Sequence, residues 1–503
     1  MNLNLLVALK YLNENVTLYE TIKPGSTSLD ALLALDLNPS LDSLCINGTC
    51  LSNGDPIPSD ANEATILVRS QLTLNTESKI RLLRRDYSQY PVYTIDPSGS
   101  TDADDGFSIF KDHSGATHLL IHIADPTAFL TANGNLFKKI VEKGQTRYPF
   151  GEPPVHLFPE QILKKSTLIN GSDIKTVAVH AVFDYAHEDQ WKLVSAGIEF
   201  CTVKCDNQFR FTYEEAADLN NETLKLGVSL ATHLWRDRVK NTPWIDTTVI
   251  FNDMILTIPR PGSNSAGPIL EPDTDKVKIM KSMIAEFAIL SNTVFAKGLT
   301  EGSLFLRSAS ITEEIRESSG LTGEDLLKKI ITEKVAASYT SKKETHDIVT
   351  GSFYTHSTSP LRRASDCIVH FLLKAKALNL PAPFTEEELK TYAMHLTCKA
   401  KEFKKEQFAS IKRQTLLWIK NNIPVKAECT IMSVVNGFIN ISINRLNDMP
   451  VNICYTIRQP SPPPDQVPGK RFSVVIKEIY LNPNSKYDAG TLPDLEKEIY
   501  QSK

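Results

Sequence analysis

Four aspartates fall within ten residues of this chain: Asp96, Asp102, Asp104 and Asp105. Carboxylates this close repel one another, and each gains from water or from a bound cation. Oxygen ligands on a rigid loop suit Mg²⁺, which takes few protein carboxylates and completes its shell with water and phosphate. The spacing therefore indicates a metal site. The alternative is a solvated turn rich in Asp, Ser and Gly.

A second polar segment, far along the chain, has the residue types of a phosphate site. Ser359 or Thr358 can cap a helix, and Pro360 fits the first helical position. Arg362 and Arg363 are then predicted to lie in the first turn, beside free backbone N–H groups and the positive end of the helix dipole. The spacing favours an anion site, with an ordinary polar helix face as the alternative.

Two further residues of this segment are predicted to support the arginines. Asp366 follows Arg362 by four residues, and His370 follows Asp366 by four. Residues four apart share one face of a helix, so the three side chains are expected to brace one another.

These side chains need elements to hold them. Apolar residues at 92–95 and 106–110 flank the aspartates, which predicts a loop pinned between two strands. Residues 119–125 read as an apolar strand that ends in a carboxylate. Residues 279–296 are predicted to form a long helix, and residues 386–421 a further helical region rich in lysine.

The pattern along the chain predicts four parts, and so a multidomain α+β protein. The first is a small α+β module, β-grasp-like or, as the alternative, OB-like. A basic linker follows, read either as a solvated helix face or as an edge that tracks phosphates. An α/β domain with C-terminal helices carries the chemistry, and short strands with turns predict an OB-like barrel at the end. The expected boundaries are 1–75, 76–90, 91–422 and 423–503.

The composition is that of an ordinary globular protein, with 41% hydrophobic and 23% charged residues and a net charge of −4. A nucleic-acid partner would therefore need a local positive field. The 8 cysteines include no Cys-x-x-Cys pair, so free thiols in a reducing compartment are expected. No targeting signal or membrane-spanning stretch is expected either. Cytoplasm is the predicted location.

The two polar segments together resemble the ribonuclease II (RNB) exoribonuclease family. An Asp-Pro…Asp-x-Asp-Asp loop is followed, much later, by Thr-Ser-Pro-Leu-Arg-Arg at 358–363. Further stretches between them match the family's landmarks in order. These are residues 122–125, 144–148, 154–160, 286–292 and 306–307. The resemblance covers roughly residues 85–380.

The resemblance implies a role for each matching residue. The four aspartates would hold Mg²⁺, or Mn²⁺ in its place, and the attacking water, with Asp104 the least dispensable for chemistry. Arg362 would neutralise charge on the phosphate in the transition state. Further residues would bind RNA: Tyr148 at the 3′ end, Glu286 at a ribose 2′-OH, and also Arg307 and Arg363. Asp366 and His370 would support the site from behind.

The chain also departs from the family pattern. Gly106 stands where the family usually has alanine, and Ala364-Ser365 replaces an aromatic-small pair. The roughly 75 residues before the linker cannot hold the two cold-shock barrels that family members usually carry.

The resemblance implies an RNB-type α/β catalytic domain and a Mg²⁺-dependent 3′→5′ exoribonuclease. It would degrade single-stranded RNA from its 3′ ends to nucleoside 5′-monophosphates, away from membranes and as a monomer. Two alternatives stay open. One is a narrow-specificity enzyme that trims RNA 3′ ends, for example those of transfer-RNA precursors. The other is a catalytically inactive RNA-binding scaffold.

Overall fold

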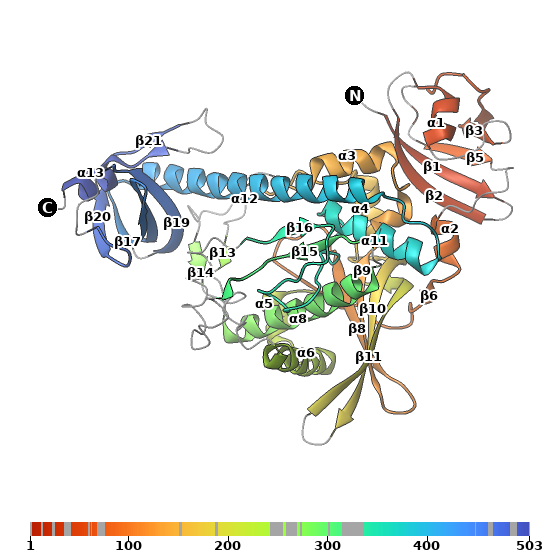
Figure 1. Cartoon of the computed structure of the whole chain (residues 1–503), viewed down its shortest axis with the longest axis horizontal. Coiled ribbons are helices and arrows are strands. Elements are labelled where there is room, and N and C mark those ends of the chain that lie inside the picture. Colours follow the sequence, from red (N-terminus) through yellow and green to blue (C-terminus); the bar gives the residue numbers. More distant parts are fainter. Residues whose placement is uncertain are drawn as a thin grey trace. The chain divides into compact units, whose positions relative to one another are not determined.

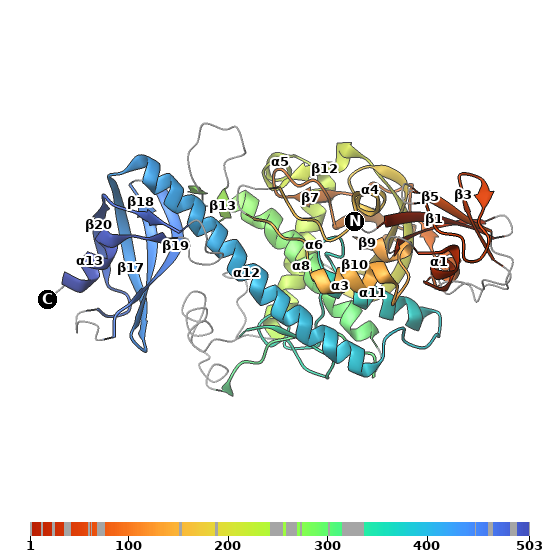
Figure 2. The ribbon, with the colours of Figure 1, turned by 90° about the horizontal axis from the view of Figure 1, so that it is seen from above.

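The structure is a computed structural model, and the chain forms two compact units (Figures 1 and 2). The first unit comprises Met1–Thr146, His156–Phe251 and Asp275–Lys399. The second comprises Arg147–Val155, Asn252–Thr274 and Ala400–Lys503. The structure describes residues 3–11, 14–22, 26–34, 42–58, 61, 63–67, 76–149, 153–186, 190–241, 255–257, 269–271, 274–299, 302–313, 336–447, 449–460, 466–482 and 490–501.

A five-stranded sheet forms the centre of the first unit, in the order β6-β11-β10-β9-β8. Its long strands are antiparallel, and only the short β6 joins in parallel. Almost every residue of β9 is buried, which agrees with the apolar residues that make up most of its sequence; His118 is the partly exposed exception. The strands are β6 (Arg85–Asp86), β8 (Asp105–Lys111), β9 (Thr117–Ala124), β10 (Gly171–Ala186) and β11 (Gln190–Cys205).

Helices and short ladders complete this unit around the sheet (Figure 1). The helix α8 packs on the sheet and on its neighbours α5 and α6, while α11 contacts α2, α3 and α8. The helices are α2 (Thr76–Arg81), α3 (Asn135–Lys143), α4 (Glu160–Ser166), α5 (Tyr213–Asp218), α6 (Glu222–Asn241), α8 (Asp275–Gly298) and α11 (Ala364–Ala377), with the short 3₁₀ turns η1 (Pro126–Phe129) and η2 (Asn207–Phe209). The ladders pair β7 (Thr94–Asp96) with β12 (Arg210–Thr212), and β15 (Leu306–Ser308) with β16 (Ser338–Thr340).

The N-terminal part of the first unit is a mixed sheet in the order β2-β1-β5-β3-β4, with one helix. Its central strands β1 and β5 run parallel, and the outer pairings are antiparallel. The elements are β1 (Leu3–Tyr11), β2 (Glu14–Ile22), α1 (Ser28–Ala34), β3 (Ser43–Ile46), β4 (Thr49–Cys50) and β5 (Glu63–Leu67).

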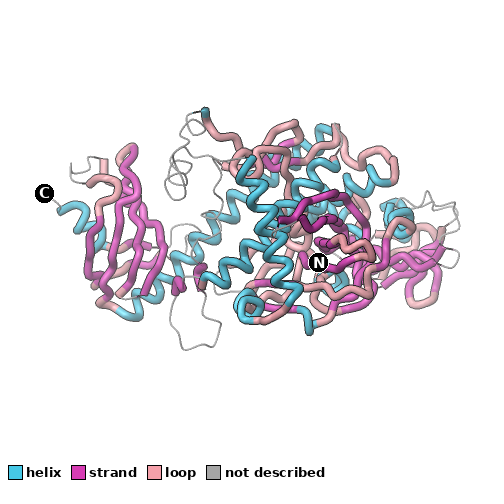
Figure 3. The backbone as a smooth tube through the Cα atoms, turned by 90° about the horizontal axis from the view of Figure 1, so that it is seen from below, coloured by secondary structure: helices cyan, strands magenta, loops and turns pink. Residues whose placement is uncertain are grey.

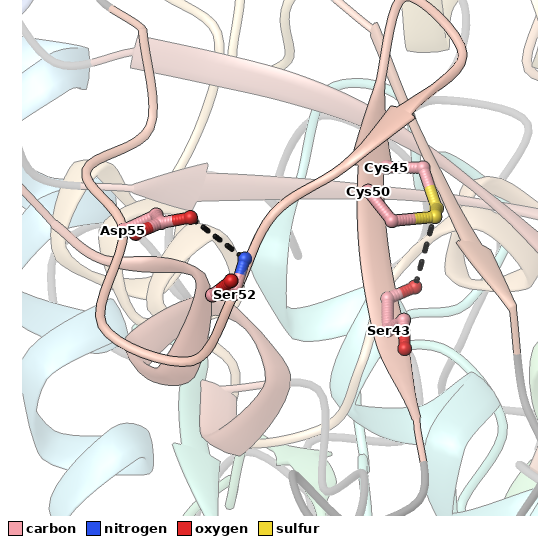
Figure 4. Close-up of a disulfide and its surroundings, with 5 residues drawn as sticks. All are labelled: Ser43, Cys45, Cys50, Ser52 and Asp55. Carbon is pink, nitrogen blue, oxygen red and sulfur yellow. Dashed lines mark hydrogen bonds between the residues drawn. A yellow bond between two sulfur atoms is a disulfide. The ribbon is translucent and has the colours of Figure 1, made fainter.

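The cysteine prediction is wrong for one pair in this sheet. Cys45 and Cys50 face each other across the β3–β4 hairpin and form a disulfide (Figure 4). Residues directly opposite in an antiparallel pair bring their Cβ atoms close enough for such a bond, a closeness that sequence spacing alone did not indicate. The other six cysteines are free.

The second unit has a four-stranded antiparallel sheet in the order β19-β18-β17-β20. Its strands are drawn in magenta near the C-terminus in Figure 3. Its apolar residues form a core of their own, separate from the core of the first unit. The elements are β13 (Ile255–Thr257), β14 (Ile269–Glu271), β17 (Val425–Val435), β18 (Phe438–Leu446), β19 (Met449–Arg458), β20 (Arg471–Ile476), β21 (Tyr480–Leu481), β22 (Gly490–Thr491) and α13 (Pro493–Gln501).

Two helices were predicted from sequence within about four residues of their ends. The predicted helix 279–296 is α8, and the helical region 386–421 is the single helix α12 (Glu386–Asn422), which contributes to both units. The expectation that no stretch could span a membrane needs correction. By length and composition alone, α8 is long and apolar enough to cross one. Half of its apolar window is buried inside the protein, which is typical of a core helix.

Candidate active site

The four aspartates lie at the edge of the central sheet, on the loop between β7 and β8. Asp96 ends β7 and Asp105 begins β8, so strands fix both ends of the loop. Between them, the buried Ala103 donates its N–H to Thr167 Oγ1 (2.9 Å) and accepts from the N–H of Leu168 (3.1 Å). The predicted loop between two strands is therefore confirmed.

The carboxylate of Asp104 joins this loop to the second polar segment. Its Oδ1 accepts the backbone N–H of Leu361 (2.7 Å), and its Oδ2 accepts from Nε of Arg362 (3.2 Å). Its backbone carbonyl accepts the N–H of Ala124, at the end of β9 (2.8 Å). Residues more than 250 positions apart in sequence thus meet at one carboxylate.

Negative charge at this site is not fully compensated. Burial, reinforced by the charges of the other aspartates, raises the pKa of Asp96 to about 8. Burial also raises the pKa of Asp104 to about 7 and that of Asp105 to about 6, although nearby arginines partly oppose the shift. Asp96 Oδ2 is buried without a hydrogen-bond partner in the part of the chain that the structure describes. Such a group is stabilised by an added cation.

The donor set fits a hard cation such as Mg²⁺. Within the described residues, no three acidic, histidine or cysteine side chains converge closely enough to hold an ion by themselves. Mg²⁺ usually needs only one or two protein carboxylates, because water and substrate phosphate complete its octahedral shell. The unpaired oxygen of Asp96 and the raised pKa values of its neighbours are the observations that support such a site.

The predicted helix start at Pro360 is wrong. The helix α11 begins only at Ala364, and Arg363 precedes it in extended conformation. Residues 359–362 instead form a tight turn, closed by the N–H groups of Arg362 and Arg363 on the carbonyl of Ser359 (3.2 and 3.0 Å). Tertiary pairing overrides the capping pattern here, because Arg363 also bridges Gln145.

The turn presents Arg362 to solvent beside the aspartates. Its side chain is 47% exposed, and its guanidinium also donates to Ser359 Oγ (2.7 Å). The cation is thereby oriented by Ser359 and Asp104 while one side stays open to a ligand. An exposed, oriented guanidinium next to carboxylates is suited to bind a phosphate.

Asp366 braces Arg363 rather than the predicted Arg362. Its Oδ1 accepts from Arg363 Nη2 (2.8 Å) and from the N–H of Ser359 (2.7 Å), and its Oδ2 accepts from Ser365 Oγ (2.8 Å). Ser365 also contacts the hydroxyl of Tyr339 (3.0 Å). The physical reason is the late helix start, which leaves Arg362 outside the helix face that was predicted to carry all three side chains.

His370 does not contact Asp366 either, so that prediction is also wrong. Its Nε2 lies 3.0 Å from the carbonyl of Ser357, and its Nδ1 lies 3.9 Å from Asp125. Asp125 belongs to a buried charge cluster with Glu77, Arg84 and Lys374, whose ion pairs measure 2.6 to 2.9 Å.

This cluster corrects the interpretation of the basic linker at Arg84. The side chain of Arg84 is only 3% exposed, so it is neither on a solvated face nor on a phosphate-tracking edge. It binds Glu77 and Asp125 and thereby fixes the chain before β6 to the core.

Glu286 and Arg307 are both held by neighbours in the first unit. Glu286, on α8, is buried and paired with Arg238 of α6, whose Nε lies 3.1 Å from its Oε2. Arg307, on β15, lies over the ring of Tyr339, 4.7 Å from its centroid. Their predicted contacts with RNA stay predictions.

Tyr148 lies in the segment Arg147–Val155, which belongs to the second unit. Its side chain is 45% exposed. Its role at the RNA 3′ end stays a prediction.

Three residues near the aspartates were not found from sequence. Arg210, on β12, donates to the carbonyl of Ser100, and its charge opposes the raised pKa of Asp96. His156 Nδ1 lies 3.8 Å from Asp102 Oδ2. Ser359 was read only as a helix cap, although it orients Arg362. No local sequence pattern indicates Arg210 or His156. Arg210 reaches the aspartates because β7 pairs with β12, and His156 reaches them through packing.

Gly106 has a physical reason for its departure from alanine. A Cβ there would lie 2.9 Å from the carbonyl oxygen of Tyr93 and 2.9 Å from a methyl carbon of Val92. The strand that begins at Asp105 therefore passes too close to residues 92–94 for any side chain at this position.

Comparison with known proteins agrees with this geometry. The RNB domain matches residues 84–309 and 272–378, more than half of the 503 residues. An uncharacterised ribonuclease of Synechocystis sp. is 22% identical over 362 residues, which cover 68% of this chain and 50% of the relative. The matched part spans about half the length of this relative, and about half that of the ribonuclease R of Chlamydia muridarum.

Two solved structures share the fold. Mycoplasma genitalium RNase R, in complex with ribose-methylated single-stranded RNA, aligns with a TM-score of 0.65 at 17% identity, over 97% of this chain and 89% of that one. Yeast Ssd1, a pseudonuclease, aligns with a TM-score of 0.56 at 15% identity, over 72% of this chain and 50% of that one.

Proposed function

Because the chain belongs to the RNB-domain family of 3′→5′ exoribonucleases, akin to ribonucleases II and R, we propose that it hydrolyses single-stranded RNA from the 3′ end. The products are nucleoside 5′-monophosphates. The observation that carries the proposal is the contact of Asp104 with Leu361 and Arg362. It places an oriented cation against a group of buried, under-compensated carboxylates, an arrangement suited to phosphoryl transfer.

The protein groups divide the work as follows. Arg362 binds the scissile phosphate and offsets the charge that develops on it. Asp104 orients Arg362 and contributes to the metal site, while Asp366 and Ser359 hold the surrounding turn. The partly buried Arg363 pairs with Asp366 and keeps the turn in place, so we propose a supporting role for it instead of direct RNA binding.

The family is generally Mg²⁺-dependent, and Asp96, Asp102, Asp104 and Asp105 are the proposed ligands, with Mn²⁺ as a substitute. When bound, the ion would offset the charge of the carboxylates and of the phosphate together. The deprotonated forms of the aspartates are the ones that bind, so the raised pKa values should fall when the ion enters.

RNA binding involves other parts of the chain in this proposal. Tyr148 stacks on a terminal base, Glu286 meets a ribose 2′-OH, and Arg307 contacts the RNA near its 3′ end. We further propose that residues 1–75 are a β-grasp-like module and residues 423–503 an OB-like barrel that binds RNA, joined to the catalytic domain 91–422. The enzyme is proposed to act as a cytoplasmic monomer. Mycoplasma genitalium RNase R, solved with single-stranded RNA, supports the choice of substrate.

The test uses the full chain with RNA that carries a label at its 5′ end and a single-stranded 3′ tail. We expect a ladder that shortens from the 3′ end in Mg²⁺ and no shortening in EDTA. DNA of the same sequence, and RNA with a blocked 3′ end, are the controls. Release of internal fragments, or equal digestion of DNA, would refute the proposal.

A second candidate function is that of an inactive RNA-binding scaffold, favoured by the likeness to the pseudonuclease Ssd1. It predicts RNA binding without mononucleotide release at any Mg²⁺ or Mn²⁺ concentration. The four aspartates and the Asp104–Arg362 contact speak for the enzyme instead.

A third candidate is an enzyme that trims selected RNA 3′ ends, such as those of transfer-RNA precursors. Comparing generic oligomers with structured, 3′-tailed RNA separates this candidate from a general nuclease, because only a trimming enzyme stops at a defined end.

A further inference from the structure

Two histidines meet on the central sheet, outside the candidate active site. His118 on β9 and His180 on β10 lie on neighbouring antiparallel strands, with His118 Nδ1 2.8 Å from His180 Nε2. The outer nitrogen of each ring contacts a carboxylate. His118 Nε2 lies 3.1 Å from Asp112 Oδ2, and His180 Nδ1 lies 2.9 Å from Glu199 Oε1.

Two neutral histidines cannot supply a hydrogen to each of these three contacts. Ionised Asp112 and Glu199 only accept hydrogen bonds, so each outer ring nitrogen must carry a hydrogen. A neutral imidazole has only one N–H, so both inner nitrogens then present lone pairs to each other. Three short contacts need three protons, whereas two neutral rings supply two. Either a proton or another cation must lie between the inner nitrogens.

We propose that His118 and His180 bind a divalent transition-metal ion of the Zn²⁺ type between Nδ1 and Nε2. A carboxylate on the outer nitrogen is the usual partner of a metal-binding histidine, because it fixes the tautomer and the ring orientation. With Zn–N bonds of about 2.0–2.1 Å at a tetrahedral angle, the nitrogens would be about 3.3 Å apart. An opening of about half an ångström admits the ion, and water supplies the other ligands.

Neighbouring side chains hold the two rings, which are partly exposed. Phe110 stacks on His118 with an interplanar angle of 3°, and the hydroxyl of Tyr87 donates to Glu199 (2.8 Å). The histidine side chains are 15% and 16% exposed.

The proposed site lies at the far end of β8 from the catalytic aspartates. Asp105 begins β8, and Asp112 follows its last residue, Lys111. The six strand residues 106–111 lie between the two, which separates them by roughly 20 Å. The ion would therefore connect β9 to β10 as a structural clip and take no part in RNA hydrolysis.

The test measures Zn²⁺ binding to the full chain in excess Mg²⁺, by competition with a chromophoric chelator. We expect one equivalent of Zn²⁺ that His118→Gln and His180→Gln each lose or weaken at least about tenfold, as a lower bound set by the loss of an orienting partner. His395→Gln is the matched control, because its Nε2 contacts only the carbonyls of Val141 and Glu142 in this structure. All variants keep the same cysteines, so the difference between them isolates the histidines.

Asp112→Asn provides a variant that leaves both histidines in place. The amide oxygen can still accept the N–H groups of Ser114 and Ala116 that hold the turn. Its NH₂ group would now donate to His118 Nε2, which moves the ring hydrogen to Nδ1 and blocks the metal-binding nitrogen. We expect Zn²⁺ affinity to fall about 10–100-fold, with circular dichroism and mononucleotide release unchanged.

Two outcomes would overturn the proposal. Equal Zn²⁺ binding by the parent and the His118→Gln/His180→Gln double variant would place the metal elsewhere. Absence of binding to a folded parent would leave a shared proton as the missing charge. Both outcomes are measured as Zn²⁺ binding, which does not depend on ribonuclease activity. The proposal can therefore fail without the proposed function failing, and the reverse.

Discussion

At the scale of single residues, Asp104 and Arg362 show how the site divides its charges. Asp104 is almost enclosed, with 11% of its side chain exposed, whereas 47% of Arg362 is exposed. The carboxylate is therefore the fixed partner, and the guanidinium is the group that a ligand can reach. A variant at each position should thus fail in a different way.

Asp104→Asn should abolish hydrolysis while RNA binding is kept. The amide can still accept the N–H of Leu361, so the turn should persist, but one charge leaves the metal site. Mononucleotide release and RNA retention on a filter measure the two effects. Turnover within about tenfold of the parent, a barrier change of only ~1.4 kcal/mol, would contradict the assignment.

Arg362→Lys should lose turnover by about 10²-fold or more, because lysine keeps the charge but not the planar fork. Arg363→Lys should instead lower stability, because the partly buried guanidinium holds the buried Asp366 through Nε and Nη2 (3.2 and 2.8 Å). Single-turnover rates and thermal melts separate the two. Identical profiles for the two variants would show that the arginines share one role.

The metal-free protein should become less stable as the pH rises. In the folded state the pKa values of Asp96, Asp104 and Asp105 are raised to about 8, 7 and 6, against about 3.9 in an unfolded chain. The folded state then binds more protons than the unfolded state between those limits. Their stabilising effect is complete below about pH 4 and is lost as the pH rises through the folded pKa values.

Thermal melts in EDTA from about pH 5 to about pH 8.5 measure this dependence. Asp96→Asn should flatten it, and Mg²⁺ should restore stability most at high pH, where the carboxylates are deprotonated. A melting temperature of the parent that rises across this range would refute the prediction.

At the scale of elements, a buried charge cluster links α2, the end of β9 and α11. Lys374 Nζ lies 2.8 Å from Glu77 and 2.9 Å from Asp125, and all three side chains are at most 4% exposed. Asp125 follows the strand residue that binds the carbonyl of Asp104. The cluster therefore supports the backbone on which the candidate site is built.

Lys374→Met should destabilise the first unit by about 3–5 kcal/mol, because two buried carboxylates would lose a cationic partner. Lys376→Met, an exposed position on the same helix, is the control and should change stability by no more than about 0.5 kcal/mol. Urea unfolding followed through loss of nuclease activity measures both. Equal midpoints for the two variants would show that the cluster adds no stability.

At the scale of the whole molecule, the two units have separate apolar cores. The core of the first unit includes Leu120, and that of the second includes Ile441, both fully buried. Units with their own cores can unfold independently. Damage to one core should therefore leave the other unit folded.

Ile441→Ala should destabilise the second unit by about 2–5 kcal/mol and lower the midpoint of one unfolding transition. Hydrolysis of a short oligomer at saturating concentration should survive to the same temperature as in the parent, because the aspartates and Arg362 belong to the first unit, whereas the second unit supplies only the proposed stacking residue Tyr148. Leu120→Ala, in the other core, should lower the temperature at which activity is lost. A single transition that both variants shift equally would refute the independence of the cores.

The sequence alone determined the elements whose signals are local, and with them the family. The apolar run at 119–125 and the long helices at 279–296 and 386–421 needed only periodicity. The aspartate spacing and the Ser-Pro-Leu-Arg-Arg stretch were sufficient to predict a phosphate and metal site. These patterns depend on contacts between near neighbours in the chain, which a sequence records directly.

Tertiary structure decided which partners these residues meet. The late start of α11 separated Arg362 from Asp366 and turned it toward Asp104, although the local capping pattern favoured an earlier start. The Cys45–Cys50 disulfide arises from strand register. Partners more than 100 residues away, such as Arg210 for the aspartate loop, leave no local signal. Such contacts depend on how elements pack, and packing is a property of the whole chain.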